Sequence, residues 1–472
     1  MLDNVIERRT PVSPTYDDLP DAVSQSVAVL TRQVRDLLEV EEKLEVAVFE
    51  RALVASFAEL GRAVMRQVLV QLDPGGRDVV VDGQRQWQAV RATHEYMTAF
   101  GRVTVERGVY RAVRNGPTLC PMELRAGIVE GFWTPHAAKL AALCISDMTP
   151  KRAESFFKEL RMMGPSRSSL DRLPKALNEH WERNRLSYEQ RVRADERIPL
   201  GAVAVAVSLD GVLVPTRGTD KAEKKAEMRR QGRLDKGPAG YREVGCAALS
   251  FYDAEGNRLL TRRVARMPEA NKLTLKEQLR GELEHVRRQR PELVVVAVAD
   301  GAADNWEYLS ALKPDHQVVD FYHAAEHLKR AVDVSMGRAG SVATLAKFEQ
   351  LRTTLRHHPS GADKVIAALK KLRPPRRGDP RDYRTGATYF HKHRQRMKYA
   401  ALHAENLPIG SGVIEGTCKS LASDRLKRAG MRWDRRGGQA ILNLRSSTQS
   451  DRFDAAWRLL QQHYSAQITE AA

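Results

Sequence analysis

Two aspartates come at the ends of apolar runs that are typical of buried strands. The run VAVAVSLDGV at 203–212 contains Asp210, and the run LVVVAVADG at 293–301 contains Asp300. Small and β-branched apolar residues before a glycine-containing turn predict strands buried on both faces, each with its acid at the exposed end. A buried carboxylate is costly unless a cation or hydrogen bonds compensate for its lost hydration. The two acids therefore predict a cation site at one edge of a sheet.

A third acid, Glu415, follows a Gly-Ser-Gly turn and opens a helix-like segment. Carboxylate oxygens, completed by water and a phosphate, are the ligands that Mg²⁺ or Mn²⁺ prefers. Three carboxylates can hold two such ions on either side of a phosphodiester. A simpler alternative stays open, because Asp-Gly is a common turn pair and both aspartates could merely end their strands.

The charge balance favours a polyanionic partner. The 472 residues include 77 Lys or Arg and 59 Asp or Glu, so the net charge is +18. Clustered cations gain affinity for nucleic acid by releasing the counterions of its phosphates. A solvated basic surface gives the same total, so the charge by itself does not decide between these two interpretations.

Cysteine usage and hydropathy limit the class of protein further. The four cysteines form no CxxC pair, which argues against a disulfide framework and a closed zinc site. No apolar run reaches the roughly 18 residues that a membrane span needs, and the N-terminus lacks a signal pattern. We expect a soluble protein of the cytoplasm with no membrane partner.

The first part of the chain is expected to be mostly helical. Apolar residues at helical spacing over 23–72 predict two long helices, which DPGG at 73–76 ends. Alternation around Gly101 and Gly108 predicts a small hairpin over 98–111.

Short helices separated by tight turns follow over 134–181 and resemble a helix-turn-helix. Thr149 and Ser166 are expected to begin two of these helices. In the last of them, Arg167 and Arg172 would face DNA. An ordinary helical bundle with basic edges is the alternative, and the sequence does not decide between the two.

The central segment predicts an α/β domain. Strands over 203–212, 244–252 and 259–264 are followed by a helix over 273–290 and a further strand over 293–299. The DAEGN sequence at 253–257 is a hairpin signal between the second and third strands. The order is three neighbouring strands, then a helix, then a strand that carries the second acid. This is the order of the ribonuclease-H-like fold.

Four motifs in this order resemble those of DDE transposases. They are SLDGV around Asp210, VADGAADNW around Asp300, VVDFYHAAEHLK around His323 and LPIGSGVIEGTCKSL around Glu415. The chain is similar to the ISKra4-type insertion-sequence family, which is related to the IS256 and Mutator-like group. The resemblance covers about 201–444 well, and the N-terminal portion only in general layout.

The resemblance implies specific roles for these residues. Asp210, Asp300 and Glu415 would bind two Mg²⁺ or Mn²⁺ ions and catalyse strand cleavage and transfer. Related transposases carry a His three residues after an Asp or Cys, as Asp320 and His323 do here. His323 would contact the scissile phosphate or orient a metal-binding carboxylate. A packing role for His323 is the alternative, which stays open.

Two basic stretches extend this interpretation to DNA contacts. Within the all-helical insertion that the resemblance implies over 324–406, residues 370–398 carry eleven Lys or Arg against two Asp, with aromatic residues between them. A solvated loop is the competing interpretation there. Further basic residues follow Glu415. The residues predicted to contact DNA in these two stretches are Arg376, Arg377, Arg381, Lys419, Arg425, Lys427, Arg428, Arg432 and Trp433.

The fold class expected is therefore α+β and multidomain. A ribonuclease-H-like α/β catalytic domain is interrupted by an all-helical insertion and preceded by a mostly helical DNA-binding region. The expected parts are a helical region at 1–95, a β-ribbon with a helix-turn-helix-like region at 96–200, the first catalytic part at 201–323, the insertion at 324–406, and the second catalytic part with closing helices at 407–472.

The function expected from all of this is DNA transposition. The protein would bind the terminal inverted repeats of its insertion sequence and the target DNA, as a homodimer or larger homo-oligomer, in the nucleoid of a bacterium. A structure-selective nuclease or resolvase of the same fold stays open, because it needs the acids without end recognition. A domesticated DNA-binding protein that does not cut also stays open, because it needs only the basic surfaces.

Overall fold

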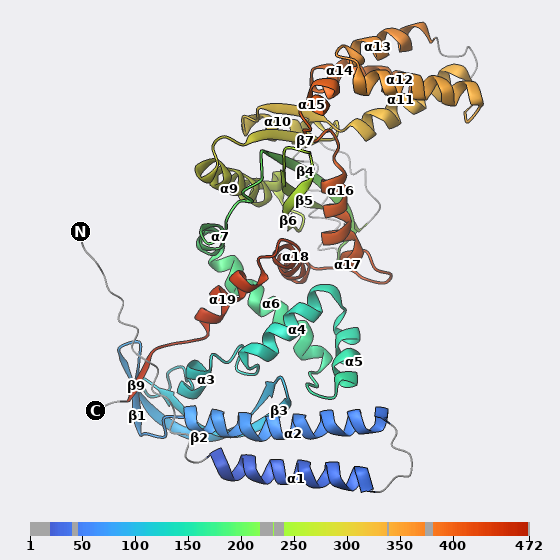
Figure 1. Cartoon of the computed structure of the whole chain (residues 1–472). Helices are drawn as coiled ribbons and strands as arrows, with labels where there is room; N and C mark the ends of the chain where they lie inside the picture. Colours follow the sequence, from blue (N-terminus) through green and yellow to red (C-terminus); the bar gives the residue numbers. More distant parts are fainter. Residues whose placement is uncertain are drawn as a thin grey trace. The chain divides into compact units, whose positions relative to one another are not determined.

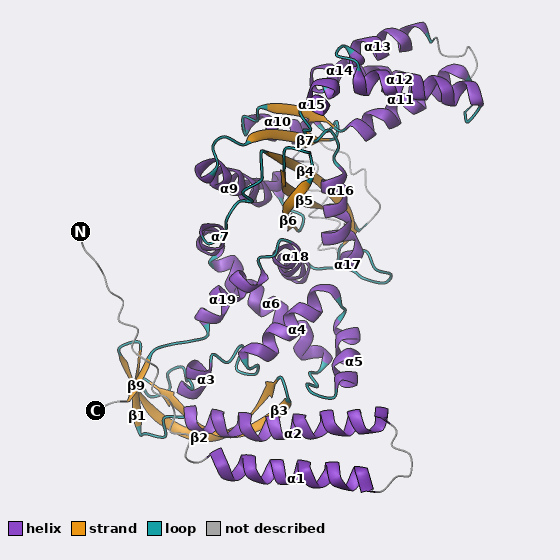
Figure 2. Ribbon diagram, viewed as in Figure 1, coloured by secondary structure: helices purple, strands orange, loops and turns teal. Residues whose placement is uncertain are grey.

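The protein has a mixed α+β fold with several helical segments and two sheets (Figures 1 and 2). We describe it from a computed structural model, in which residues 19–39, 46–217, 230, 240–337, 339–372 and 381–470 are described. The chain forms two compact units. Unit 1 comprises Met1–Asn184 with Asp454–Ala472, and unit 2 comprises Arg185–Phe453. Among the described residues, no helix is long and apolar enough to cross a membrane.

Unit 1 begins with the two long helices that the sequence predicts. They are α1 (Leu19–Glu39) and α2 (Val46–Leu72), and α2 ends just before the predicted DPGG turn. The predicted hairpin is present but longer. It joins β2 (Gln84–Thr98) to β3 (Gly101–Arg111), and Gly108 lies inside β3 rather than at a turn. A Cβ at Gly108 would lie 2.6 Å from the Tyr110 ring, so close packing explains this glycine.

The sheet of unit 1 has the order β3-β2-β1-β9. Its edge strand β9 (Ile468–Glu470) comes from the far end of the chain and pairs with β1 (Asp78–Val81). The sequence predicts a closing helix in this tail, and α19 (Phe453–His463) confirms it, whereas β9 has no such signal.

Four helices complete unit 1. Thr149 and Ser166 begin two of them as predicted, because each side chain accepts a hydrogen bond at 3.2 Å from the backbone N–H three residues on. The helices are α3 (Pro121–Ala126), α4 (Pro135–Asp147), α5 (Pro150–Leu160) and α6 (Arg167–Arg183).

Unit 2 is built on a five-stranded mixed sheet with the order β6-β5-β4-β7-β8. The first three strands along the chain pair antiparallel, whereas β4, β7 and β8 run parallel to one another. The predicted hairpin at 253–257 joins β5 and β6. The strands are β4 (Ala204–Pro215), β5 (Tyr241–Tyr252), β6 (Arg258–Arg266), β7 (Val294–Ala299) and β8 (His316–Val319).

Helices cover both faces of this sheet. The predicted helix at 273–290 is α9 (Leu273–Gln289), and its Leu275 lies against Gly245 of β5. The next residue of β5, Cys246, faces the opposite side and meets Cys418, since successive strand residues point to opposite faces. Of the other helices, α10 (Ala303–Ala311) and α16 (Gly412–Thr417) contact β4, and α18 (Arg435–Gln449) contacts β6. Unit 2 also contains α7 (Arg185–Ala194) and α17 (Asp424–Leu426).

The described part of 324–406 is helical, as the resemblance implies. Buried residues of β4, β7 and these helices form one continuous apolar core, so the helices share a core with the sheet. Asp320 caps the first helix by accepting a hydrogen bond from the backbone of His323. The helices are α11 (Phe321–Met336), α12 (Val342–His357), α13 (Gly361–Lys371), α14 (Arg381–His393) and α15 (Tyr399–Ala404). The five-part division proposed from the sequence stays a prediction.

Candidate metal and nucleic-acid site

Asp210 lies within β4 rather than at its end, which corrects the expectation of an exposed strand end. β5 continues to pair with β4 as far as Pro215, whereas β7 pairs only with Ala204–Val207. The strand therefore runs on past the end of its parallel neighbour. Asp210 sits on this extension, opposite Cys246, and it is half-buried.

Asp210 and Asp300 are brought together at the end of β7. Asn305, in the first turn of α10, donates to the carbonyl of Leu209 at 3.2 Å and to Oδ1 of Asp300 at 3.4 Å. Burial raises the pKa of the Asp210 carboxyl, and the nearby charge of Asp300 raises it further, against the lowering effect of the Gly211 N–H. The like charges are therefore close enough to oppose ionisation, as two carboxylates without a cation do.

Glu415 lies in α16, the element that packs against this part of β4. Its Oε1 accepts a hydrogen bond from Ser411 Oγ at 2.9 Å, and its side chain is exposed. One helical turn further on, the Cys418 thiol lies 3.8 Å from Oδ2 of Asp210. Residues three apart on a helix share a face, so Glu415 lies on the side of α16 that faces the acids.

The donor atoms suit a hard divalent cation, although the three acids are not assembled as a group. In the described part of the chain, no three His, Cys, Asp or Glu side chains gather so that they could hold a metal ion. The pair of Asp210 and Asp300 fits such a cation, because both supply oxygen ligands and their mutual repulsion would be relieved by it. Glu415 does not join them in such a group, and its Oε1 accepts the hydrogen bond from Ser411.

His323 lies in a cavity of about 570 Å³ that Asp300 also lines. His323 and Asp300, which two separate sequence motifs identify, therefore line the same cavity. His327 lies one turn further along α11 and stacks on Tyr389 of α14, with 4.1 Å between ring centroids and 18° between planes. Tyr389 and His393 also line this cavity. They belong to the basic aromatic stretch predicted to contact DNA, but nothing in the sequence indicates that they reach Asp300.

Burial lowers the pKa of two imidazoles in this cavity. The pKa of His393 falls to about 4, with the charges of Lys392 and Arg396 contributing, and the pKa of His327 is also lowered. Both rings are therefore neutral at pH 7, and each offers one N–H donor and one acceptor.

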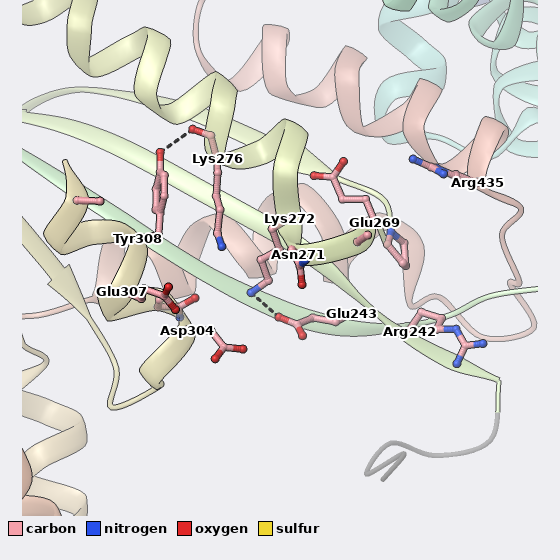
Figure 3. A pocket seen from close by; sticks show the side chains of 14 residues that line it. Arg242, Glu243, Glu269, Asn271, Lys272, Lys276, Asp304, Glu307, Tyr308 and Arg435 are labelled. Atoms are coloured by element: carbon pink, nitrogen blue, oxygen red, sulfur yellow. Dashed lines mark hydrogen bonds and ion pairs between the residues drawn. The ribbon is translucent and has the colours of Figure 1, made fainter. Parts of the chain in front are cut away.

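A second cavity, of about 960 Å³, is lined by residues of β5, α9 and α10, among them Asn305, which bonds to Asp300 (Figure 3). Lys272 has a left-handed backbone with φ +53°, and its ammonium pairs with Glu243 at 2.7 Å. A Cβ at Gly211 would lie 2.6 Å from Cδ of Glu243, so this glycine makes room for the pair beside Asp210. Lys272 lowers the pKa of Asp210 and Glu243 raises it. Neither residue has a motif that would identify it from the sequence.

The residues predicted to contact DNA lie in different environments. Arg425 is only 1% exposed and its guanidinium stacks on Trp433, with 5.1 Å to the ring centroid. This arginine packs inside unit 2 instead of lying on the surface, because its apolar neighbours and the Trp433 ring enclose it. Trp433 is half-buried, and its indole N–H donates to the carbonyl of Leu426 at 3.0 Å.

The other predicted contacts are mostly accessible. Arg428 is half-buried, and Arg376 and Arg377 lie outside the described residues. The exposed residues are Arg167 and Arg172 in unit 1, and Arg381, Lys419, Lys427 and Arg432 in unit 2.

Comparisons with known proteins give little further information. No protein-family model matches the chain, and no curated protein matches it. Four chains from solved structures match. One belongs to a Drosophila P element transposase strand transfer complex, with 12% identity over 70% of this chain and 81% of that chain, and a TM-score of 0.25. A likeness at that score supports no argument about fold or function.

Proposed function

We propose that the protein is a DDE-type DNA transposase that cleaves the ends of its insertion sequence and joins them to target DNA. The observation that carries this proposal is the meeting of Asp210, on the extension of β4, with Asp300, at the end of the parallel strand β7, where their charges oppose each other. The element that bears Glu415 packs beside them. The basic balance of the chain, with a net charge of +18, supports DNA as the partner.

The proposal includes a ribonuclease-H-like fold for unit 2. Three antiparallel strands, then a helix and a parallel strand that ends at the second acid, support it. The helices α11 to α15 stand between the second and third acids, where the resemblance implies an insertion. A dimer or larger assembly that pairs two ends is part of the same proposal.

Asp210, Asp300 and Glu415 are proposed to hold two Mg²⁺ or Mn²⁺ ions. When bound, such ions activate a water or 3′-hydroxyl and stabilise the departing oxygen. The chain's own residues prepare the site. Asn305 bridges the Asp300 carboxylate and the Leu209 carbonyl of β4, and Ser411 orients Glu415 by donating to its Oε1.

Cleavage of the element's own ends tests the proposal. A labelled DNA fragment that carries those ends is incubated with Mg²⁺ or Mn²⁺ and with the native protein, Asp210→Ala, Asp300→Ala or Glu415→Ala. We expect nicking at the ends by the native protein, and binding without nicking by each variant. Glu307→Gln, which removes an exposed acid on α10 outside the proposed ligands, serves as the matched control and should cut as the native protein does.

Three results would change the proposal. Cutting at the native rate by one of the three variants removes that acid from the ligand set. Native cutting of branched DNA without preference for the ends favours a structure-selective nuclease. Native binding without any cutting favours a DNA-binding protein that has lost catalysis.

A further inference from the structure

The cavity beside Asp300 is lined almost entirely by groups that donate hydrogen bonds. Its walls come from the turn after β7, from α11 and from α14, and Asp300 is the one acid that lines it among the described residues. We call it the α14 cavity. The donors that α14 contributes are Arg384, Thr385, Thr388, Tyr389, Lys392 and His393.

Two buried polar atoms of the α14 cavity have no hydrogen-bond partner among the described residues. They are Oη of Tyr389 and Nδ1 of His393, in side chains that are 8% and 2% exposed. Buried polar groups are rarely left without a partner, because the loss of hydration is then uncompensated. A bound ligand with acceptor atoms explains both orphaned groups.

Two other tyrosines of unit 2 differ from Tyr389 in this respect. Tyr383, in the same helix, donates to the carbonyl of Leu369 at 2.8 Å, and Tyr399 donates to that of Val319 at 2.9 Å. The fold therefore satisfies these two tyrosine hydroxyls, whereas the buried hydroxyl of Tyr389 has no partner among the described residues.

Close packing holds Tyr389 and His393 in place. Gly386 lets α14 approach α11, since a Cβ there would lie 2.9 Å from the carbonyl oxygen of His327. A Cβ at Gly301 would lie 2.7 Å from the Tyr389 ring and 3.2 Å from Nε2 of His393. Both side chains therefore lie directly against the residue that follows Asp300.

The rim of the cavity carries positive charge that no described residue neutralises. Arg384 and Lys392 are exposed and form no ion pair with a described residue. Two cations, two hydroxyl-bearing threonines and two buried donors together suit an anion with several acceptor oxygens. A phosphate group has this chemistry, whereas a carboxylate offers fewer acceptor oxygens.

We propose that the α14 cavity binds a backbone phosphate of the DNA strand, next to the phosphodiester that is placed at Asp210 and Asp300. The inference rests on the proposed function, which brings a DNA strand to these acids. Tyr389 and Lys392 act as positioning residues, because they fix the strand through a phosphate that does not react. The helical insertion thereby takes part in holding the substrate.

Binding of a fluorescein-labelled duplex that carries the element's ends tests the proposal. Fluorescence polarisation is measured in EDTA, over a range of salt concentrations, for the native protein, Lys392→Gln and Tyr389→Phe. We expect Lys392→Gln to bind more weakly and to lower the slope of log K against log salt by about 1, because one phosphate contact is lost. Tyr389→Phe should weaken binding by roughly twofold to tenfold, the range for one hydrogen bond.

Matched variants on α13 and α14 separate this effect from a general loss of charge or fold. Lys364→Gln removes an exposed lysine of α13, and Tyr383→Phe removes a tyrosine hydroxyl that bonds within the protein. Both should bind DNA as the native protein does. Thermal melting of every variant shows that it is folded.

Neutral methylphosphonates, placed one at a time along the duplex, locate the contact. One substitution near the cleaved bond should weaken native binding and have no further effect on Lys392→Gln, because the two changes remove the same interaction. If both cavity variants bind with the native affinity and salt slope while the native protein still cuts, the inference fails and the proposed function stands. If the native protein does not bind DNA at all, both fail.

Discussion

Unit 2 contains two clusters of buried or half-buried carboxylates that differ in their counter-charges. In the first, Arg452 donates to Glu282 at 2.7 and 2.9 Å and also to Glu196, while Arg193 donates to Glu282 at 3.2 Å. Burial opposes ionisation of Glu282, but the arginines outweigh it and lower its pKa to about 2. In the second cluster, Asp210 and Asp300 have no arginine among the described residues, and the pKa of Asp210 is raised.

The contrast separates a structural cluster from the one to which we assign a function. The arginines tie α7, α9 and the segment before α19 together, and nothing from outside is needed to neutralise Glu196 and Glu282. The aspartate pair lacks such compensation, and the proposed function therefore assigns it a cation from solution. Uncompensated charge in a cleft is a sign of function, whereas paired charge is a sign of architecture.

The largest expected effect is the loss of catalysis that Asp300→Asn causes. The cleavage rate should fall by about a thousandfold or more, because a metal ligand contributes several kcal/mol to the transition state. The melting temperature should stay within a few degrees of the native value, since the substitution removes repulsion with Asp210. Single-turnover cleavage and thermal melting measure the two quantities. A large loss of stability with an unchanged cleavage rate would show that Asp300 has a structural role and not a catalytic one.

The next effect is on stability and comes from the arginine cluster. Arg452→Met should lower the free energy of unfolding by about 3–5 kcal/mol, because it leaves buried Glu282 and Glu196 short of a counter-charge. Arg280→Met, which removes an exposed arginine of α9, should change it by less than about 0.5 kcal/mol. Urea unfolding gives both values. Equal effects of the two substitutions would show that the cluster is not a structural one.

The two clusters should also respond to pH with opposite sign. The pKa of Glu282 is lowered from 4.5 to about 2, so its contribution to stability is present above pH 4.5 and is lost as the pH falls towards 2. The pKa of Asp210 is raised, so its ionisation disfavours the folded state as the pH rises through its folded value. Glu282→Gln should therefore reduce the slope of the free energy of unfolding against pH, in the range below pH 4.5, by up to about 1.4 kcal/mol per pH unit.

Asp210→Asn is the counterpart of this variant. It should raise the free energy of unfolding at pH 7 and leave it unchanged below pH 3, because the Asp210 carboxyl is unfavourable to the folded state only when it is ionised. Urea unfolding from pH 2.5 to 8 compares it with Glu282→Gln. The same pH profile for both variants would mean that the two clusters have the same electrostatic environment.

The sequence predicts the elements of unit 2 well, because its strands and helices have strong apolar periodicity and clear turns. The strands at 244–252 and 293–299 and the DAEGN hairpin are found as expected, and in unit 1 so are the caps at Thr149 and Ser166. The exposed end expected for Asp210 is wrong, since a strand's length depends on its partner β5 and not on its own composition. The short edge strand β9 carries no local signal, for it exists only by pairing with β1.

Contacts between distant segments explain what the sequence does not reveal about the site. The approach of His393 to Gly301 depends on the packing of α14 against α11 at Gly386, which no spacing encodes. Arg425 looks like its exposed basic neighbours in the sequence, yet the Trp433 ring covers it. Lys272 and Glu243 look like ordinary surface charges until β4 and β5 are paired beside them.

The smallest expected effect is on the free energy of unfolding and concerns two tyrosines of α14. It extends the contrast between compensated and uncompensated groups to side chains without charge. Tyr383→Phe should lower the free energy of unfolding by about 1 kcal/mol, because it removes a hydrogen bond to the Leu369 carbonyl. Tyr389→Phe should leave stability unchanged or raise it slightly, since the hydroxyl that it removes has no described partner. Urea unfolding without DNA measures both. A clear loss of stability in Tyr389→Phe would show that its hydroxyl is satisfied within the protein, and the α14 cavity would then lose its main evidence for a ligand.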